Sequence, residues 1–238
     1  MNRKPEVFQS SVVCVGAFNP PIVTPEWLNR HKLIGDEDAD RSRKSPSLLI
    51  TPQVAQFESL WFGLQILENQ FTATSKGVVT PAFKDLVVGV LTLLPQTPIT
   101  AMGMNFMAHY KLGSFAEYHH FGDALTPKRA WKNLIKKEGH HAGLANLTMQ
   151  IREMSRENMT LKTQDFVAVT VQPSTQFQPG IFLAYNDHRA LSQKDDDAKL
   201  PMERAAETLD TEWEFVQGEA KGAFGILIDD ALNDQQNG

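Results

Sequence analysis

The order of predicted elements is the same in both halves of the chain: a strand, a short helix, three strands and a longer helix. The first half begins with a strand at 11–17 and a helix at 24–28, and ends with a helix at 80–94. The corresponding patterns in the second half are a strand at 100–110, a helix that begins at 126–131 and a helix at 201–232. Three of these helices open with Thr-Pro, which suits an N-cap followed by the first helical position.

Further strand-like runs lie between these elements. They cover 48–50, 54–67 and 69–74 in the first half, and 144–151, 165–171 and 180–185 in the second. A short helix is also indicated at 114–121. The connections are short enough for hairpins, which favours an α+β fold with an antiparallel sheet.

The repeated order predicts a single α+β domain over 1–232, followed by a disordered tail at 233–238. Its two similar halves, about 9–96 and 97–232, would join in one curved sheet with the two longer helices on the concave face. TATA-box-binding-protein-like and helix-grip folds have this arrangement and serve as fold analogies. Internal duplication would explain the repeat. Thr-Pro is also a common helix opening, so both explanations stay open.

Composition indicates a globular protein of the cytoplasm. Of the 238 residues, 42% are hydrophobic, which is ordinary for a folded domain and too high for wholesale disorder. There is no apolar run of roughly 18 residues, and the start lacks the apolar core of a signal peptide. Cys14 is the single cysteine, which excludes an internal disulfide and a zinc site built on cysteines. We therefore expect a cytoplasmic protein without membrane contact.

The formal net charge of −5 is unevenly placed along the chain. Acidic runs occur at 36–40 and 195–197, and the polar stretch 35–47 is predicted to be a solvated loop. A basic run comprises Lys128, Arg129, Lys132, Lys136 and Lys137. On a helix over 128–137, every fourth residue lies on one face, where lysines suit an acidic partner or nucleic-acid phosphates. The simpler interpretation is a solvated helix face, with Trp131 buried as an anchor.

Three side chains are weak candidates for a metal site: His119, Asp123 and His140. The histidines occur as the adjacent pairs His119-His120 and His140-His141. Adjacent side chains point in different directions, so each pair offers about one ligand to a common centre, and we predict no bound metal. The sequence Asn186-Asp187-His188 resembles part of a general-base unit, but Asn-Asp is also a turn signal. Nucleophile and phosphate-binding glycine motifs are absent from the sequence, so neither a catalytic residue nor a cofactor is predicted.

The methionine-rich strand at 100–110 suggests a second kind of site. With a long helix gripping the sheet, an interior around Met104, His109 and Tyr185 would suit a small apolar ligand. Core packing explains the same residues more simply, because an alternating strand turns only one face to a pocket. Three glycines interrupt the last helix, at Gly218, Gly222 and Gly225. They indicate close packing against another backbone, or else a kink or an earlier helix end.

Three segments resemble a family of uncharacterised bacterial proteins of similar length. They are Val-Gly-Ala-Phe-Asn-Pro-Pro-Ile-Val-Thr-Pro-Glu-Trp at 15–27, Ile-Thr-Ala-Met-Gly-Met-Asn-Phe at 99–106 and Tyr-Asn-Asp-His at 185–188. The resemblance covers most of the chain. It implies an α+β fold and brings no activity, because the motifs are not catalytic signatures.

These patterns favour a non-enzymatic accessory or adaptor protein of a bacterium or phage, acting inside the cell through protein–protein contacts. The expected partner is another protein, with a further copy of the chain as one option. Two alternatives stay open: a small-molecule-binding or enzymatic helix-grip-like domain, and a nucleic-acid contact through the basic helix at 128–137.

Overall fold

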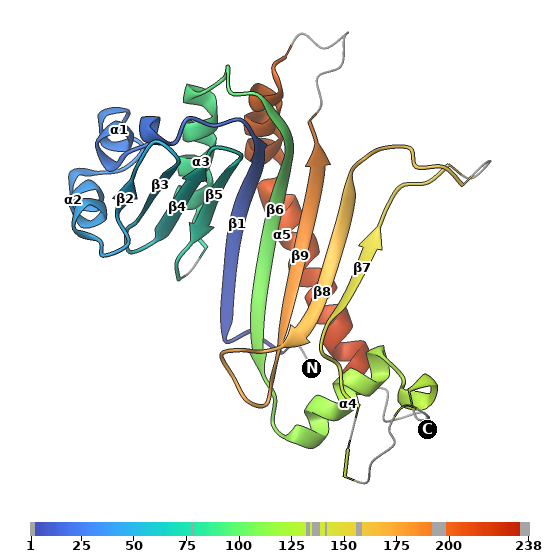
Figure 1. Ribbon diagram of the computed structural model, residues 1–238. Helices are drawn as coiled ribbons and strands as arrows, with labels where there is room; N and C mark the ends of the chain where they lie inside the picture. The colour runs from blue at the N-terminus through green and yellow to red at the C-terminus, as the bar shows by residue number, and fades with distance from the viewer. Residues whose placement is uncertain are drawn as a thin grey trace.

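The computed structural model has an α+β architecture in which a nine-stranded antiparallel sheet carries helices on one face (Figure 1). It describes residues 3–77, 79–131, 134, 139–140, 142–155, 159–191 and 199–233. The strands are β1 (Val7–Gly16), β2 (Leu49–Ile50), β3 (Val54–Glu58), β4 (Phe62–Leu67), β5 (Gln70–Ser75), β6 (Ile99–Lys111), β7 (Leu147–Ile151), β8 (Phe166–Pro173) and β9 (Gly180–Ala190). The helices are α1 (Pro25–Arg30), α2 (Asp36–Lys44), α3 (Pro81–Leu93), α4 (Phe115–Leu125) and α5 (Pro201–Asn233), with 3-10 turns η1 (Pro20–Ile22) and η2 (Lys128–Ala130).

The two halves of the chain meet along the central strands β1 and β6. The strand order is β2-β3-β4-β5-β1-β6-β9-β8-β7. In each half the last strand returns to pair with the first, β5 with β1 and β9 with β6. The predicted antiparallel sheet and the long C-terminal helix are therefore confirmed.

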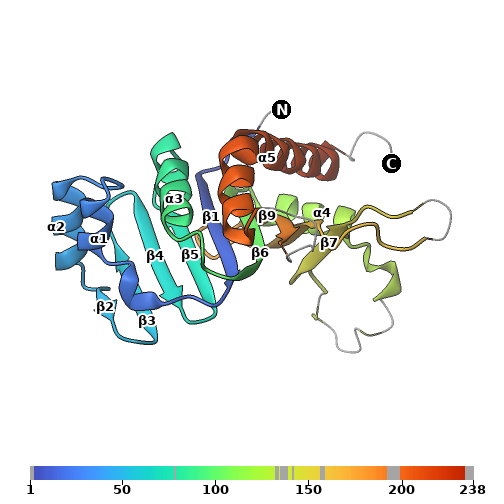
Figure 2. The ribbon, with the colours of Figure 1, turned by 90° about the horizontal axis from the view of Figure 1, so that it is seen from above.

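Alternation along the strands gives the sheet a buried face and an open face. Val12 and Met104 lie opposite each other on the buried face, and Figure 2 shows α3 and α5 both on this side of the sheet. Gln9 and Asn105 are half-buried and alternate with the buried residues of β1 and β6, so they point to the other face. Figure 1 is seen from that face, and the sheet lies in front of α3 and α5. Buried apolar side chains from both halves form one core cluster.

Helix α5 is held on the sheet by an aromatic contact and by ion pairs. Trp213 packs against Phe106 of β6, with ring centroids 4.8 Å apart. Arg189 of β9 donates to the Asp187 carboxylate on its own strand and, at 2.8 Å, to Glu212 of α5. Asp187 is buried, and this pairing offsets the cost of removing its charge from water.

Residues 36–44 form helix α2, so the predicted solvated loop over 35–47 is wrong. Acidic side chains fill the first turn and basic ones the last turn, an arrangement that the helix dipole favours. The Asp38 carboxylate also accepts hydrogen bonds from Ser59 Oγ at 2.5 Å and Trp61 Nε1 at 3.0 Å. These bonds fix α2 against the turn between β3 and β4. The second acidic run, 195–197, lies outside the described residues.

Residues 54–67 contain two strands, where the sequence pattern was interpreted as one. The chain turns back at 59–61, and the Ser59 amide donates to the Phe62 carbonyl at 2.9 Å. Among the described residues, the first half therefore has four strands after its short helices, whereas the second half has the predicted three. Helix α5 continues to Asn233, the first residue of the predicted tail, and 234–238 lie outside the described residues.

The glycines of α5 are not explained by close packing within the chain. A Cβ built at Gly218, Gly222 or Gly225 would meet no described atom within 4 Å. The helix also neither ends nor breaks at these positions. The packing interpretation of these glycines is therefore wrong for contacts inside the described part of the molecule.

Candidate functional site

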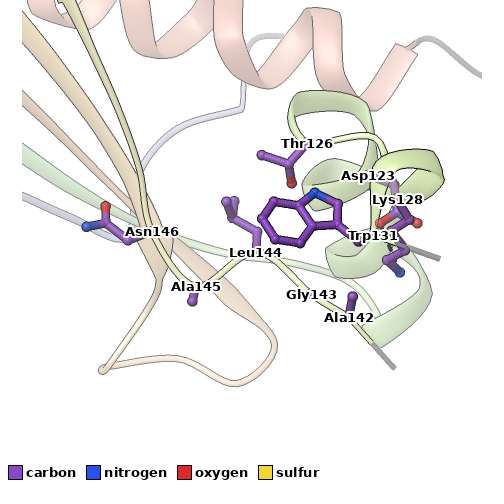
Figure 3. Close-up of a pocket in the computed structure, with 9 residues that line it drawn as sticks. All are labelled: Asp123, Thr126, Lys128, Trp131, Ala142, Gly143, Leu144, Ala145 and Asn146. Carbon is purple, nitrogen blue, oxygen red and sulfur yellow. Dashed lines mark ion pairs between the residues drawn. The ribbon is translucent and has the colours of Figure 1, made fainter. Parts of the chain in front are cut away.

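A pocket of about 270 Å³ lies between helix α4 and the segment that leads into β7 (Figure 3). It is lined by Asp123, Thr126, Lys128, Trp131 and residues 142–146. Sites for small molecules are usually larger, roughly 300–1,000 Å³. The pocket lies near the lower end of that range, a size that one or two side chains of a protein partner can fill.

The start of α4 is fixed by a reciprocal cap. Ser114 Oγ accepts from the Glu117 amide at 3.1 Å, and the Glu117 carboxylate accepts from the Gly113 amide at 2.6 Å. Arg3 donates to the same carboxylate at 2.6 Å. Burial disfavours the ionised carboxylate, but the bonds from Arg3 and Gly113 outweigh burial and lower the pKa of Glu117. This side of the pocket thus rests on a well-anchored helix.

The end of α4 lies in close contact with the segment around Leu144, which forms the opposite wall of the pocket. The amide and hydroxyl of Thr126 both donate to the Gly122 carbonyl, at 2.9 and 2.7 Å, and Pro127 then prevents the helix from continuing. A Cβ at Gly122 would lie 3.3 Å from Leu144 Cβ. The absence of a side chain at Gly122 therefore lets Leu144 pack tightly on α4, beside the pocket.

Trp131 is 53% exposed, so the prediction that it is buried in the core is wrong. Residues 128–130 form the short turn η2, so 126–131 are not an α-helix that would rotate the indole inward. Figure 3 shows the ring extending into the pocket toward Leu144, with Thr126 nearby. An exposed indole beside an apolar wall is typical of protein interfaces, where tryptophan is enriched.

The described members of the predicted basic surface are Lys128 and Arg129. Lys128 Nζ lies 2.9 Å from Asp123 Oδ1, and this ion pair forms part of the pocket rim (Figure 3). Arg129 is exposed on η2. The other three members, Lys132, Lys136 and Lys137, lie outside the described residues. The pairing with Asp123 reduces the positive charge that Lys128 offers to a partner.

The three weak candidates for a metal site do not form a cluster. His119 and Asp123 share α4, where His119 is exposed and Asp123 pairs with Lys128. His140 is exposed beyond η2. Among the residues that the structure describes, no group of three histidine, cysteine or acidic side chains is arranged to hold a metal ion.

Met104, His109 and Tyr185 do not line a common interior. Met104 and Tyr185 point to the face that α5 covers, where Met104 is fully buried. His109 lies an odd number of residues from Met104 on β6, so it points to the opposite face. There its Nδ1 lies 2.9 Å from Ser174 Oγ, and its ring contacts Phe182.

Asp187 and His188 are also separated by the alternation of a strand. Asp187 points beneath α5 and pairs with Arg189, whereas His188 stacks on Phe166 with ring centroids 4.4 Å apart. Burial is the main cause that lowers the pKa of His188. The two side chains therefore do not form the general-base unit considered from the sequence.

Strand β7 continues the pocket wall into an exposed edge of the sheet. Met149 and Ile151 lie opposite Val169 and Val167 and share the buried face, yet they are 61% and 64% exposed. Sequence reasoning missed both this edge and the lining segment 142–146. Alternating apolar residues predict a strand with a covered face, and only the strand order reveals that β7 is the last strand.

Comparison with known proteins adds no identity to this site. The chain matches no model of a known protein family. No curated protein matches it at a significant level. Within the described residues, no helix is long and apolar enough to cross a membrane.

Proposed function

We propose that the protein is a non-enzymatic intracellular adaptor of a bacterium or phage, and that it binds a protein partner at the pocket around Trp131. The exposed indole is the observation that carries this proposal. Tryptophan is among the residues whose truncation costs most binding energy in protein interfaces. A half-exposed tryptophan beside a preformed hollow offers such an anchor without a change in the backbone.

The chemistry of the pocket defines the kind of partner. Its walls include Leu144 and two alanines, which favour an aliphatic or aromatic side chain. Asn146 and the Lys128–Asp123 ion pair supply neutral and charged hydrogen-bonding groups around it. The proposed partner therefore presents an apolar side chain flanked by polar groups, as in the core and rim of a protein interface.

The same geometry weakens the two alternatives. A nucleic-acid contact loses part of its charge because Asp123 pairs with Lys128, and the chain carries a net charge of −5. A ligand enclosed by Met104, His109 and Tyr185 would need side chains that lie on both faces of the sheet.

The test compares partners captured by the full-length protein with those captured by a Trp131→Ala variant, using extract of the source organism. We expect at least one partner whose affinity falls about thirtyfold, because truncating an interface anchor costs about 2 kcal/mol. Phe215→Ala is the matched control, since Phe215 is 66% exposed on α5 and does not line the pocket. Equal capture by wild type and Trp131→Ala, or equal loss in both variants, would overturn the proposal.

We also propose that the two halves arose by duplication, and that the fold is related to TATA-box-binding-protein-like or helix-grip folds. The shared return of the last strand to the first in each half supports this origin. The extra strand of the first half would then be a later addition.

A further inference from the structure

Strand β7 is an open edge of the sheet. It pairs with β8 on one side, and no described strand lies on its other side (Figure 1). The outward backbone groups of such an edge form a template for a further strand. An extra strand there would continue the antiparallel ladder.

The sequence around β7 lacks the features that normally prevent edge pairing. Residues 142–151 contain no charged residue and no proline. The opposite edge of the sheet differs, because β2 has only two residues and is too short to be a good template. The exposed Met149 and Ile151 side chains add an apolar surface to the open edge. An edge of this kind is expected to be covered by another strand.

We propose that the covering strand is β7 of a second copy of this chain, in an antiparallel pair centred on Met149. In this register Leu147 lies opposite Ile151 of the second copy, Thr148 opposite Gln150, and Met149 opposite Met149. All five residues of β7 are paired. Apolar residues meet apolar ones on one face, and polar residues meet polar ones on the other. A shift by one residue would break this match.

The absence of charge makes a second copy an acceptable occupant. Identical strands with charged side chains would place like charges opposite each other, which destabilises the pair. β7 has no such side chain, so its own sequence is complementary to itself. A two-fold pair also closes on itself and leaves no further copy of this edge exposed.

This pairing goes beyond the proposed function and changes the surroundings of the Trp131 pocket. In the same register, Arg152 of the second copy lies opposite Asn146, and Glu153 of the second copy lies opposite Ala145. Both Asn146 and Ala145 line the pocket. Within its own chain Arg152 lies over the Phe166 ring, and Glu153 pairs with Lys162. The second copy would thus place the backbone of 152–153, and not two free charged side chains, beside each pocket, and the dimer would present two partner sites.

Cysteine cross-linking of the full-length protein tests the register. Cys14 is fully buried, and burial raises the pKa of its thiol to about 12, so the native chain gives a low background. A Met149→Cys variant treated with a short thiol-to-thiol cross-linker is expected to become a covalent dimer. The Leu147→Cys variant alone is expected to give no covalent dimer, because its two cysteines do not lie opposite each other. A mixture of Leu147→Cys and Ile151→Cys is expected to give a covalent dimer between the two variants.

Molar mass in solution tests the interface independently of the cross-linker. We expect wild type and Trp131→Ala to be dimers, and Met149→Lys to be a folded monomer whose melting temperature no longer depends on protein concentration. A monomeric wild type at submillimolar concentration would overturn the proposal. So would a dimer that survives Met149→Lys, or Leu147→Cys coupling to itself as well as Met149→Cys does.

Discussion

At the scale of single residues, glycines with the same sequence signal have opposite roles in this fold. A Cβ at Gly16 would lie 2.3 Å from the Pro98 carbonyl oxygen and 2.6 Å from Ile99 Cα, where β1 meets the start of β6. Gly218 lies on α5 with open space around its Cα. The sequence predicts neither environment, because the close approach at Gly16 comes from a segment about 80 residues further along the chain.

Alanine substitutions distinguish these two environments. Gly16→Ala is expected to lower the free energy of unfolding by about 2 kcal/mol or more, because backbone atoms block its Cβ. Gly218→Ala, the matched change in a helix, is expected to raise it by up to about 1 kcal/mol. Urea unfolding of both variants measures the difference. A tolerated Gly16→Ala would contradict the packing of β1 on 98–99.

His109 makes the stability of the fold depend on pH. Ser174 Oγ accepts hydrogen bonds from the amides of Gln176 and Phe177, so its proton is donated to Nδ1 of His109. Burial lowers the pKa of His109 from its ordinary value of 6.5. The unfolded chain therefore takes up a proton before the folded one does, and stability is lost as the pH falls through 6.5 toward the lower folded pKa.

The corresponding prediction concerns melting temperature. Wild type is expected to melt at a lower temperature about one unit below pH 6.5 than about one unit above it. His109→Gln is expected to show a smaller difference, and His188, whose pKa burial also lowers, contributes to the part that remains. An equal or steeper pH dependence in His109→Gln would show that His109 is not the source.

At the scale of elements, the sequence alone predicts the helices and strands that are determined by residues close together in the chain. Thr24 caps α1 by accepting from the Trp27 amide at 3.1 Å, as Thr-Pro predicts. Thr80 opens α3 without a side-chain cap bond, and the predicted helix start at Thr126 is wrong, because Thr126 ends α4. The apolar stripe of α3 and the alternation of β6 were also predicted and are confirmed. Helix α2 was missed because it has few apolar residues, although its charge order from acidic to basic was a usable signal.

The candidate site was less predictable, because it depends on which strand lies at the end of the sheet. The basic run drew attention to Lys128, and Trp131 was noted beside it. Residues 142–146 form the other wall of this pocket. The position of this segment is determined by the pairing of β7 with β8. Strand order results from contacts between distant segments, which the alternation of a single strand does not encode.

The buried ion pair of β9 beneath α5 gives a prediction at this scale. Asp187→Ala would leave Arg189 without its buried partner, and we expect a loss of about 2 kcal/mol in the free energy of unfolding. The control is Glu207→Gln, which breaks the exposed pair with Lys199 and is expected to change stability by less than about 0.5 kcal/mol. Denaturant titration measures both, and equal losses would contradict the role given to Asp187.

At the scale of the whole molecule, the two halves are joined at the centre of the sheet, whereas the surface proposed for binding lies at one end of it. β1 and β6 join the halves at the centre, where buried side chains from both form one core. Strand β7 is the last strand of the sheet on the side of the second half, and α4 lies near it (Figure 1). The Trp131 pocket lies between α4 and the segment that leads into β7. Partner binding at this end would therefore leave the joint between the halves intact.

The most direct test of this account is hydrogen–deuterium exchange of the wild-type protein, alone and with the partner captured through the Trp131-dependent assay. We predict slower exchange with the partner bound at 126–131 and 142–146, and unchanged exchange in α2 at the other end of the sheet. Protection confined to α2 or to the open face of the sheet, with none around the pocket, would contradict the account.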